Sequence, residues 1–208
     1  MTPLVIDIET APNTGMEVYL PEPEAPANYK DPQKITAYIA AKKQTQVESM
    51  ALDVDLCRVI ALGYGDLEDH PFVEVANGDD ASERSLLVSF WALVEDPRTA
   101  IMGYNILGFD LPIIARRSMM LGITPTRLFD TRKYGNHDVI DLMTLLYPTG
   151  SARGLKTICK MLGITNPLDG TDGSQVAHMD LKELAAYCAN DVSLTQALAT
   201  RMKGLYWL

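Results

Sequence analysis

The sequence predicts an α/β protein in which a mixed β-sheet is covered by helices. Short β-branched runs alternate with longer segments of helical periodicity, in the order strand, strand, strand, helix, strand, helix, and the C-terminal third is helical. The chain has 208 residues, of which 47% are hydrophobic. This length and composition support one hydrophobic core without disulfides or structural metal. We therefore expect a single domain over residues 1–208.

The first predicted strand covers residues 3–8, which are β-branched and apolar and lead into polar residues. Residues 12–32 contain five prolines, which forbid regular secondary structure and predict a surface excursion. A modest helix is expected over 33–50. This Pro-rich insertion, at about 12–50, could act as a lid or as a partner contact, or it could be a plain irregular loop.

The next part of the chain predicts a hairpin followed by a helix. Residues 57–65 and 71–76 are two strands joined by an acidic turn. Residues 82–95 form an amphipathic helix, with Ser82 expected as its N-cap.

The rest of the chain is predicted to be largely helical. A strand at 99–103 leads into a helix that begins near Asp110 and stops at Gly122. Further helices are expected near 138–147, 154–162 and 181–203. Asp180 and Glu183 stand at the N-cap and N3 positions of the last helix, an aspartate variant of the capping box.

Composition argues against several kinds of protein. No run of eighteen apolar residues could span a bilayer and no secretory signal is visible, so we expect a cytoplasmic protein without a membrane partner. The three cysteines are widely spaced and lack CxxC pairing, which argues against disulfides and a zinc ribbon. They are expected to be reduced core residues. The three histidines are too scattered for a metal site.

The formal net charge of −9 is unusual for a protein that binds nucleic acid, because phosphate contacts need a basic surface. The charges are unevenly distributed, however. Residues 116–133 carry five basic residues and one acidic residue, and residues 153–160 carry three basic residues. Residues 66–83 carry seven acidic residues and no lysine or arginine. The sequence therefore predicts one basic and one acidic side, unless these charges only keep the protein soluble.

Three segments carry candidate catalytic residues. In the first, Asp7 and Glu9 lie two residues apart at a strand end, so both carboxylates point to the same side of the sheet. Such a pair suits a hard divalent cation. Taken alone, an acidic pair at a strand end is more commonly solvated.

The second segment, GYNILGFD at 103–110, turns from a strand end through glycine into the start of a helix. A carboxylate at Asp110 is favoured by the helix dipole, so it could be a simple N-terminal cap. Phe109 fits a core anchor better than a base-stacking platform.

The third segment is YCAND, within the long C-terminal helix. Tyr187 and Asp191 are four residues apart, which places the phenol and the carboxylate on one face of that helix. Aspartate is a poor helix former, so its position in the middle of a helix asks for a reason. The alternatives are an exposed surface charge for Asp191 and a half-buried core aromatic for Tyr187.

In this order, DIET, NILGFD and YCAND resemble the three motifs of the DEDD superfamily of 3′-to-5′ exonucleases. A tyrosine four residues before the last aspartate is typical of the DEDDy branch, whereas the DEDDh branch carries a histidine where this chain has Ala186. GYNILGFDLPII, HDVIDLM and YCANDV are similar to the proofreading domains of family-B DNA polymerases and their stand-alone relatives. The resemblance covers nearly the whole chain and is weakest over 12–50.

This resemblance implies an RNase H-like fold, with a five-stranded mixed β-sheet flanked by helices. It also implies hydrolysis of phosphodiester bonds at the 3′ end of DNA, preferably single-stranded, with two Mg²⁺ or Mn²⁺ ions as cofactors and nucleoside 5′-monophosphates as products. By position, Asp7 would bridge both cations and Asp110 would hold the second. Glu9 and Asp191 would complete the first site, and Tyr187 would orient the attacking water.

The resemblance further implies contacts to the terminal nucleotide from Thr10 and Asn105, which could equally be turn-capping residues. Arg153 and Lys156 could steer the phosphate backbone. An RNase D-like exoribonuclease and a non-catalytic nucleic-acid-binding module of the same fold are the alternatives. Proofreading, repair and replication of phage or mobile elements would each fit, with a replication or repair protein as partner.

Overall fold

The computed structural model describes residues 3–130, 138–171 and 173–206. Within these ranges the centre of the protein is a mixed sheet of five strands, in the order β3-β2-β1-β4-β5. The strands are β1 (Leu4–Pro12), β2 (Cys57–Gly65), β3 (Phe72–Val75), β4 (Ile101–Gly103) and β5 (Val139–Asp141). β1, β2 and β3 pair antiparallel, whereas β4 and β5 run parallel to β1. The predicted α/β fold class is confirmed.

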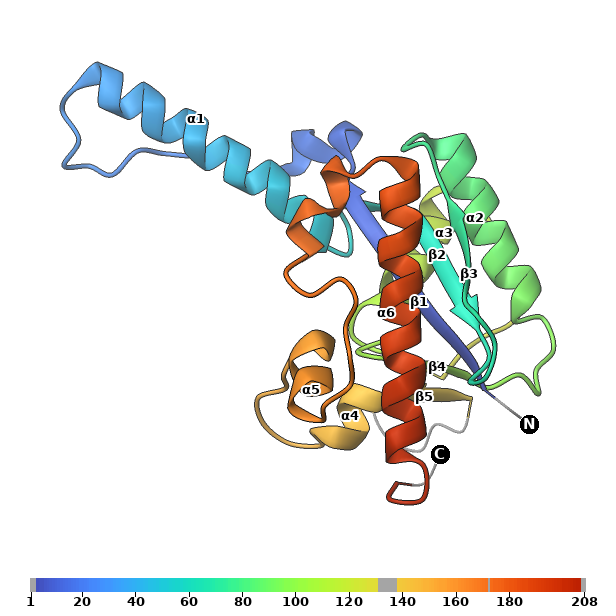
Figure 1. Ribbon diagram of the computed structural model, residues 1–208. Coiled ribbons are helices and arrows are strands. Elements are labelled where there is room, and N and C mark those ends of the chain that lie inside the picture. The colour runs from blue at the N-terminus through green and yellow to red at the C-terminus, as the bar shows by residue number, and fades with distance from the viewer. Residues whose placement is uncertain (1–2, 131–137, 172, 207–208) are drawn as a thin grey trace.

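Helices cover both faces of this sheet (Figure 1). The main helices are α2 (Asp80–Leu93), α3 (Asp110–Met120), α4 (Leu142–Leu146), α5 (Leu155–Met161) and α6 (Leu181–Met202). α2 and α3 pack on one face, and α6 crosses the other face beside α4 and α5. The capping box of Asp180 and Glu183 at the start of α6 is present as predicted.

Side chains alternate between the two faces along β1, and this alternation sets the position of the acidic pair. Ile6 and Ile8 join the core beneath α2 and α3, whereas Val5 joins the core beneath α6. Asp7 and Glu9 share the parity of Val5, so both carboxylates lie on the α6 side of the sheet.

The segment predicted as a helix over 138–147 begins with a strand instead. Val139 and Ile140 pair in parallel with β4, and α4 starts only at Leu142. Asp141 closes the strand and caps the helix, since its carboxylate accepts the N–H groups of Met143 and Thr144. A strand of three residues that passes directly into a helix has no room for a period-two pattern, which explains the wrong prediction.

Helix α2 begins two residues earlier than predicted, at Asp80. Its N-cap is Asp79, whose carboxylate accepts the Ser82 N–H at 2.8 Å. Ser82 is therefore the residue being capped, and the prediction that it is the cap was wrong. Aspartate and serine are comparable N-caps, so two candidates three residues apart could not be separated by sequence.

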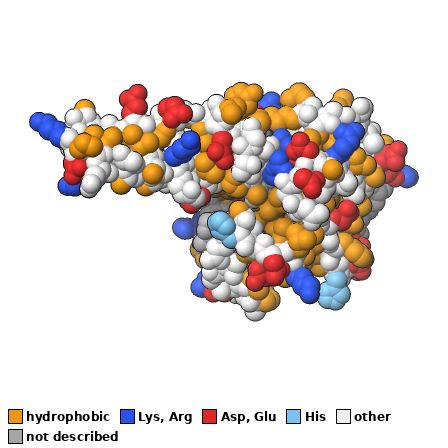
Figure 2. Space-filling view, turned by 90° about the horizontal axis from the view of Figure 1, so that it is seen from above, with side chains coloured by type: hydrophobic (Ala, Val, Ile, Leu, Met, Phe, Trp, Pro, Cys, Tyr) orange, Lys and Arg blue, Asp and Glu red, His pale blue; other side chains and the backbone are white. Residues whose placement is uncertain are grey.

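The Pro-rich insertion is more regular than predicted and projects from the body of the protein (Figures 1 and 2). A 3₁₀ helix, η1 (Thr14–Tyr19), forms between the first two prolines of the segment, where no regular structure was expected. Residues 21–31 lack helix and strand, and the chain then returns as helix α1 (Pro32–Ser49). We call residues 21–49 the arm.

Two further findings concern the described residues. No helix there is long and apolar enough to cross a membrane. Cys57, Cys159 and Cys188 are all buried and form no disulfide, as predicted for core residues.

Candidate active site

The acidic pair on β1 lies against the first part of α6. Asp7 is paired with Gly63 of β2, and Glu9 with Ala61. The register shifts directly after Glu9, at a bulge between Glu9 and Thr10. Carboxylate oxygens of Asp7 and Glu9 lie within 4.8 Å of each other and of the Cys188 sulfur, a spacing at which they could share a cation.

Asp110 joins this pair from the first residue of α3. Its Oδ1 accepts the backbone N–H of Ile8 at 3.1 Å, although the two residues are 102 positions apart in the chain. Phe109, not Asp110, is the N-cap of α3, and it makes no side-chain capping bond. The alternative that Asp110 simply caps its own helix is therefore wrong, because its carboxylate holds the strand that carries the acidic pair.

Asp141 stabilises the turn that precedes Asp110. Its two carboxylate oxygens accept the N–H groups of Asn105 and Leu107, each at 3.1 Å. Asn105 has a left-handed backbone with φ of 64°, and a Cβ on Gly108 would lie only 2.5 Å from its Oδ1. Sequence reasoning missed Asp141. The available signal was an aspartate at the end of a β-branched pair, as in the first motif.

Helix α6 brings Tyr187 and Asp191 to the site because it lies very close to β2. A Cβ on Gly63 would fall 2.7 Å from Val192 Cγ2 and 2.8 Å from Cys188 Sγ. Only glycine allows this approach, which places the third motif beside Asp7, the residue paired with Gly63. Tyr187 is buried and Asp191 is nearly so, which rules out an exposed surface charge as the explanation of Asp191.

Lys156 of α5 completes the site through its contacts with Tyr187 and Asp191 of α6. Its Nζ donates a hydrogen bond to Tyr187 Oη at 2.5 Å and lies 3.4 Å from Asp191 Oδ2. It also donates to the carbonyl of Thr171 at 3.1 Å. Lys156, Tyr187 and Asp191 line an open cavity of about 220 Å³. The lysine therefore reaches the acidic cluster itself.

Burial raises the pKa values of all four carboxyl groups, and repulsion from neighbouring carboxylates raises those of Asp7 and Glu9 further. For Asp7 burial is the largest cause, and the charges of Glu9, Asp110 and Asp191 raise its pKa further. Burial raises the pKa of Asp110 to about 7, against the lowering effect of the Ile8 N–H. Four carboxylates crowded in this way are stabilised by nearby positive charge, which Lys156 supplies in part.

The predicted substrate contacts lie at different depths. Thr10 is buried, and its hydroxyl donates to the carbonyl of Ala51 at 2.6 Å. Asn105 is half-buried in the turn before Asp110, and Phe109 is half-buried and packs against the core beneath α2 and α3. Arg153 is exposed and lies three residues before Lys156, ahead of the start of α5. The acidic residues, Tyr187 and Lys156 are thus brought together, with Arg153 outside the cluster.

The basic side predicted from residues 116–133 is not a free phosphate-binding surface. Arg117 is buried in a bidentate ion pair with Glu83, at 2.7 and 2.8 Å. Arg116 pairs with Asp55, and Arg127 is buried against backbone carbonyls. The remaining two basic residues of this cluster, at 132 and 133, lie outside the described residues. The prediction is wrong for Arg117 and Arg127, which are buried, whereas Arg116 is exposed and paired with Asp55.

Two solved structures share the fold over nearly the whole chain. The family-B DNA polymerase of the hyperthermophilic archaeon Pyrobaculum calidifontis matches with a TM-score of 0.59 and 19% identity, over 97% of this chain and 24% of the polymerase. Exonuclease I of E. coli in complex with a dT13 oligonucleotide matches with a TM-score of 0.53 and 14% identity, over 98% of this chain and 41% of that chain. This chain therefore spans less than half of either protein. The fold is the RNase H-like one of polymerase exonuclease domains.

A family model narrows the assignment. Residues 50–205 match predicted 3′-5′ exonucleases related to the exonuclease domain of PolB, and the chain belongs to this family. The matched range contains Asp110, Tyr187 and Asp191, and it leaves out Asp7, Glu9 and the arm. A comparison with curated proteins finds no match.

Proposed function

We propose that this protein is a DEDDy-type exonuclease that removes nucleotides from the 3′ end of single-stranded DNA and releases nucleoside 5′-monophosphates. The observation that carries the proposal is the convergence of the three motifs on the α6 side of β1, where the Asp110 carboxylate accepts the Ile8 N–H. The small cavity of about 220 Å³ over Asp191 favours a single strand, because a duplex end would first have to be separated.

The donor set fits two divalent cations. Asp7, Glu9, Asp110 and Asp191 offer only carboxylate oxygens, the ligands that Mg²⁺ and Mn²⁺ prefer. Burial raises the pKa values of all four, and Lys156 offsets this effect only in part, so bound cations would stabilise the ionised carboxylates. The neighbouring Cys188 thiol is a soft donor and lies 3.9 Å from the Asp7 carbonyl oxygen, so we do not include it among the ligands. Bound there, the cations would acidify the attacking water and stabilise the charge on the departing 3′ oxygen.

Tyr187 would position the water that attacks phosphorus. A phenol is a weak base at neutral pH, so orientation is a better role for it than proton abstraction. Its hydroxyl is fixed by Lys156 Nζ and hydrogen-bonded with the Asp191 carboxylate, so its direction is set before substrate binds. Attack on phosphorus in line with the leaving oxygen requires such a fixed direction.

Positive charge and polar groups around the cluster would hold the substrate. The Lys156 ammonium would contact the scissile phosphate, because it already lies beside Asp191. The exposed Arg153 would steer the phosphate backbone, and its alanine variant should reduce the salt slope of binding by about one. Asn105 would contact the terminal nucleotide from the turn before Asp110. Thr10 and Phe109 are not included, because the Thr10 hydroxyl is bonded to the Ala51 carbonyl and Phe109 packs against the core beneath α2 and α3.

The test is digestion of a 5′-labelled single-stranded DNA oligonucleotide and its RNA counterpart with Mg²⁺, Mn²⁺ or EDTA. We expect a metal-dependent ladder that shortens from the 3′ end of DNA. Asp7→Ala should abolish it, and Glu95→Ala, which removes an exposed carboxylate of another surface, should not. Cleavage of RNA alone would favour an RNase D-like exoribonuclease. Binding of the oligonucleotide without cleavage under any metal would contradict the proposal and favour a non-catalytic module.

A further inference from the structure

Helix α1 of the arm carries positive charge that the protein does not neutralise. The arm has four exposed lysines that enter no ion pair within the part of the chain that the structure describes: Lys30, Lys34, Lys42 and Lys43. Three of them lie in residues 32–47, a stretch of α1 without an acidic residue. The acidic residues of the arm lie outside this stretch, and two of them are engaged: Asp31 caps α1, and Glu48 accepts the Gln44 amide at 2.8 Å. In a chain with a net charge of −9, this part of α1 is locally basic.

Two tyrosines lie among these lysines. Lys34, Tyr38 and Lys42 are spaced four residues apart on α1, which places them along one face of the helix. Tyr29, next to Lys30 in the chain, packs edge-on against Tyr38 with ring centroids 5.6 Å apart and is 39% exposed. We call these five residues the lysine–tyrosine stripe. Unpaired nucleic acid is commonly bound by this combination, because lysines neutralise phosphates and aromatic rings stack on bases.

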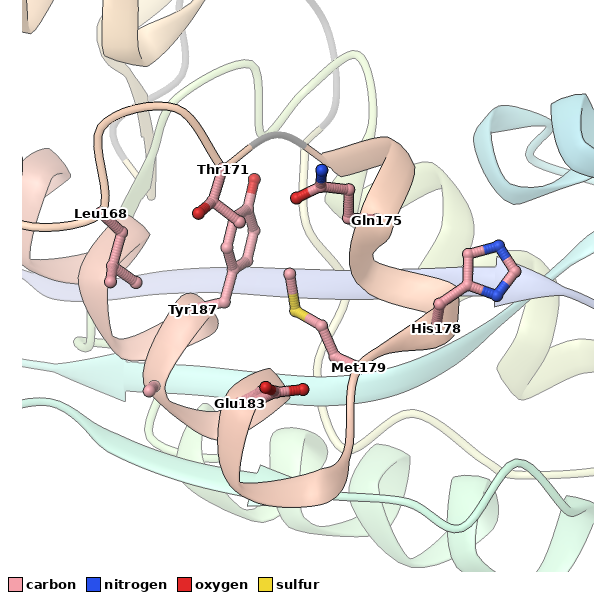
Figure 3. Close-up of a pocket in the computed structure, with 8 residues that line it drawn as sticks. Leu168, Thr171, Gln175, His178, Met179, Glu183 and Tyr187 are labelled. Carbon is pink, nitrogen blue, oxygen red and sulfur yellow. The ribbon is translucent and has the colours of Figure 1, made fainter.

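The arm leaves the sheet at the edge of the candidate active site. It follows the strand end that carries Glu9, and its return is tied to that end because the Thr10 hydroxyl donates to the Ala51 carbonyl at 2.6 Å. The 3₁₀ helix η3 (Gly173–His178) packs beside β1, between Tyr187 and the base of the arm (Figures 1 and 3). A strand whose end lies at the acidic cluster can therefore leave the site over η3 and continue along the arm.

Helix α1 is long enough to lie along several nucleotides. Its 18 residues, at 1.5 Å per residue, span about 27 Å. Stacked nucleotides are about 3.4 Å apart along a strand, so α1 matches about eight of them. Lys34 lies in the first turn of α1, at the far end of the arm, where Figure 2 shows lysine side chains in blue. Contacts with the stripe are thus made several nucleotides upstream of the bond that is cleaved.

We propose that the lysine–tyrosine stripe binds the substrate strand upstream of its 3′ end, and that the arm thereby favours long single strands over short ones. The inference rests on the proposed exonuclease function and adds a second contact to it. The family match begins at residue 50, so the stripe lies outside the segment that the family shares. A single strand uses both parts of the stripe, whereas an acidic protein surface would use the lysines and leave the tyrosine rings without a role.

Two lysines of α1 provide a matched pair of variants. At 3.6 residues per turn, Lys43 lies about 180° around the helix from Lys34. Both are exposed and enter no ion pair among the described residues, so Lys34→Ala and Lys43→Ala remove the same charge from opposite faces. Tyr29→Leu is a third variant, which removes an aromatic ring and keeps apolar bulk against Tyr38.

The first measurement is binding of a 16-nucleotide thymidine strand in EDTA, followed by fluorescence anisotropy at several salt concentrations. Lys34→Ala should reduce the slope of log Kobs against log[salt] by about 0.7, the value for one phosphate contact of a single strand. Lys43→Ala should leave the slope unchanged. Tyr29→Leu should weaken binding by about tenfold at every salt concentration, because it removes a ring on which a base stacks.

The second measurement is 3′-end release from the same strand and from a trinucleotide, which is too short to reach from the acidic cluster to Lys34. Tyr29→Leu should raise KM for the long strand by about tenfold, with kcat unchanged, and leave both constants for the trinucleotide unchanged. An equal rise of KM for both substrates overturns the proposal, and so does a salt slope that Lys34→Ala and Lys43→Ala change equally.

Two further outcomes separate this proposal from the proposed function. If the wild type binds the long strand and cleaves none, the exonuclease function fails, and the salt slopes in EDTA still decide whether the stripe holds a strand. If the wild type does not bind the long strand at all, the proposal is overturned. A change in the sedimentation coefficient of the free protein in Lys34→Ala would identify the stripe as a contact between two copies of the chain and would also overturn it.

Discussion

Asp7 and Gly63 face each other across β1 and β2, and the missing side chain of Gly63 is what allows α6 to lie beside Asp7. A Cβ at position 63 would meet Val192 and Cys188 at 2.7 and 2.8 Å, well inside van der Waals contact. The residues that it would displace belong to the same helix as Tyr187 and Asp191. The distance between the first and third motifs thus depends on one glycine.

Gly63→Ala should therefore reduce activity more than stability. Overpacking at this contact should cost about 1–3 kcal/mol in the free energy of unfolding. A displacement of α6 by about 1 Å should lower kcat by about a hundredfold. Gly65→Ala is the control, because the nearest atom to its Cβ would be Gln196 Nε2 at 3.2 Å and the next, Pro71 Cα, would lie at an ordinary contact distance of 3.5 Å. Urea unfolding and 3′-end release would be measured for both, and full activity in Gly63→Ala would refute this account of the site.

Tyr187→Phe should slow cleavage and leave cation binding intact. The substitution keeps the ring and removes the hydroxyl that bonds to Lys156 and Asp191. Loss of the oriented hydroxyl should lower kcat by about tenfold to a hundredfold. Mn²⁺ binding, followed by electron paramagnetic resonance, should be unchanged because the carboxylates remain. Tyr64→Phe removes a hydroxyl bonded to Glu74 at 3.2 Å, remote from the cluster, and serves as the control. Unchanged turnover in Tyr187→Phe would remove its proposed role.

Stability of the metal-free protein should fall as pH rises towards neutrality. The pKa of Asp110 is raised from 3.8 to about 7 in the fold, so the folded protein binds more protons than the unfolded chain between these values. Stability then decreases as pH rises through that window. At about 1.4 kcal/mol per pKa unit, Asp110 alone could lower the free energy of unfolding by roughly 4 kcal/mol.

This pH dependence is checked by thermal unfolding in EDTA at pH 5 and pH 8. The difference in Tm between pH 5 and pH 8 should be smaller for Asp110→Asn than for the wild type, because the amide does not titrate. Saturating Mn²⁺ should restore stability at pH 8, since cations that bind only the folded state stabilise it. If the wild type in EDTA has the same Tm as Asp110→Asn at both pH values, the pKa of Asp110 is not raised in the fold, and this prediction is wrong.

Much of the site was visible in the sequence because it depends on local spacing. Two carboxylates two apart on a strand, or a phenol and a carboxylate four apart on a helix, share a face whatever the rest of the protein does. The α/β class could be predicted as well, because each strand and helix was recognised from the periodicity of its own residues. What the sequence could not show is contact between distant segments, such as the Gly63 approach to α6 or the bond from Ile8 N–H to Asp110.

The basic cluster illustrates the opposite error. Residues 116–133 look like a phosphate-binding surface because charge is counted along the chain, while its cancellation occurs across the fold. Arg117 turns inward to Glu83, which is 34 residues away and completely buried. Counting charges predicts solubility and long-range attraction, and it cannot tell which side chains are already paired.

Arg117→Ala should consequently be a stability variant. Removing one member of a buried ion pair leaves Glu83 uncompensated and should cost about 3–5 kcal/mol. The matched control is its neighbour, Arg116→Ala, which breaks a pair with Asp55 that is about half exposed and should cost less than about 1 kcal/mol. Urea unfolding measures both. Equal losses for the two variants would contradict the ion-pair arrangement.

The arm should be removable without loss of the fold. No residue of α1 is buried, and Tyr38 of α1 packs edge-on against Tyr29, which also belongs to the arm. Gln46 Nε2 donates to the Pro21 carbonyl at 3.0 Å, so residues 22–45 can be replaced by a short Gly–Ser linker that joins two neighbouring points.

We expect this deletion to change Tm by less than about 4 °C, since no core surface is lost. Replacement of α2 by the same linker, which removes the buried Leu86, Leu87 and Phe90, would by contrast unfold the protein. The exonuclease assay then decides what the arm does. Retained activity with retained Tm identifies an irregular extension that is dispensable for cleavage. Reduced activity with retained Tm shows that the arm touches the substrate strand, and a large fall in Tm would mean that the arm supports the core through contacts that its exposure conceals.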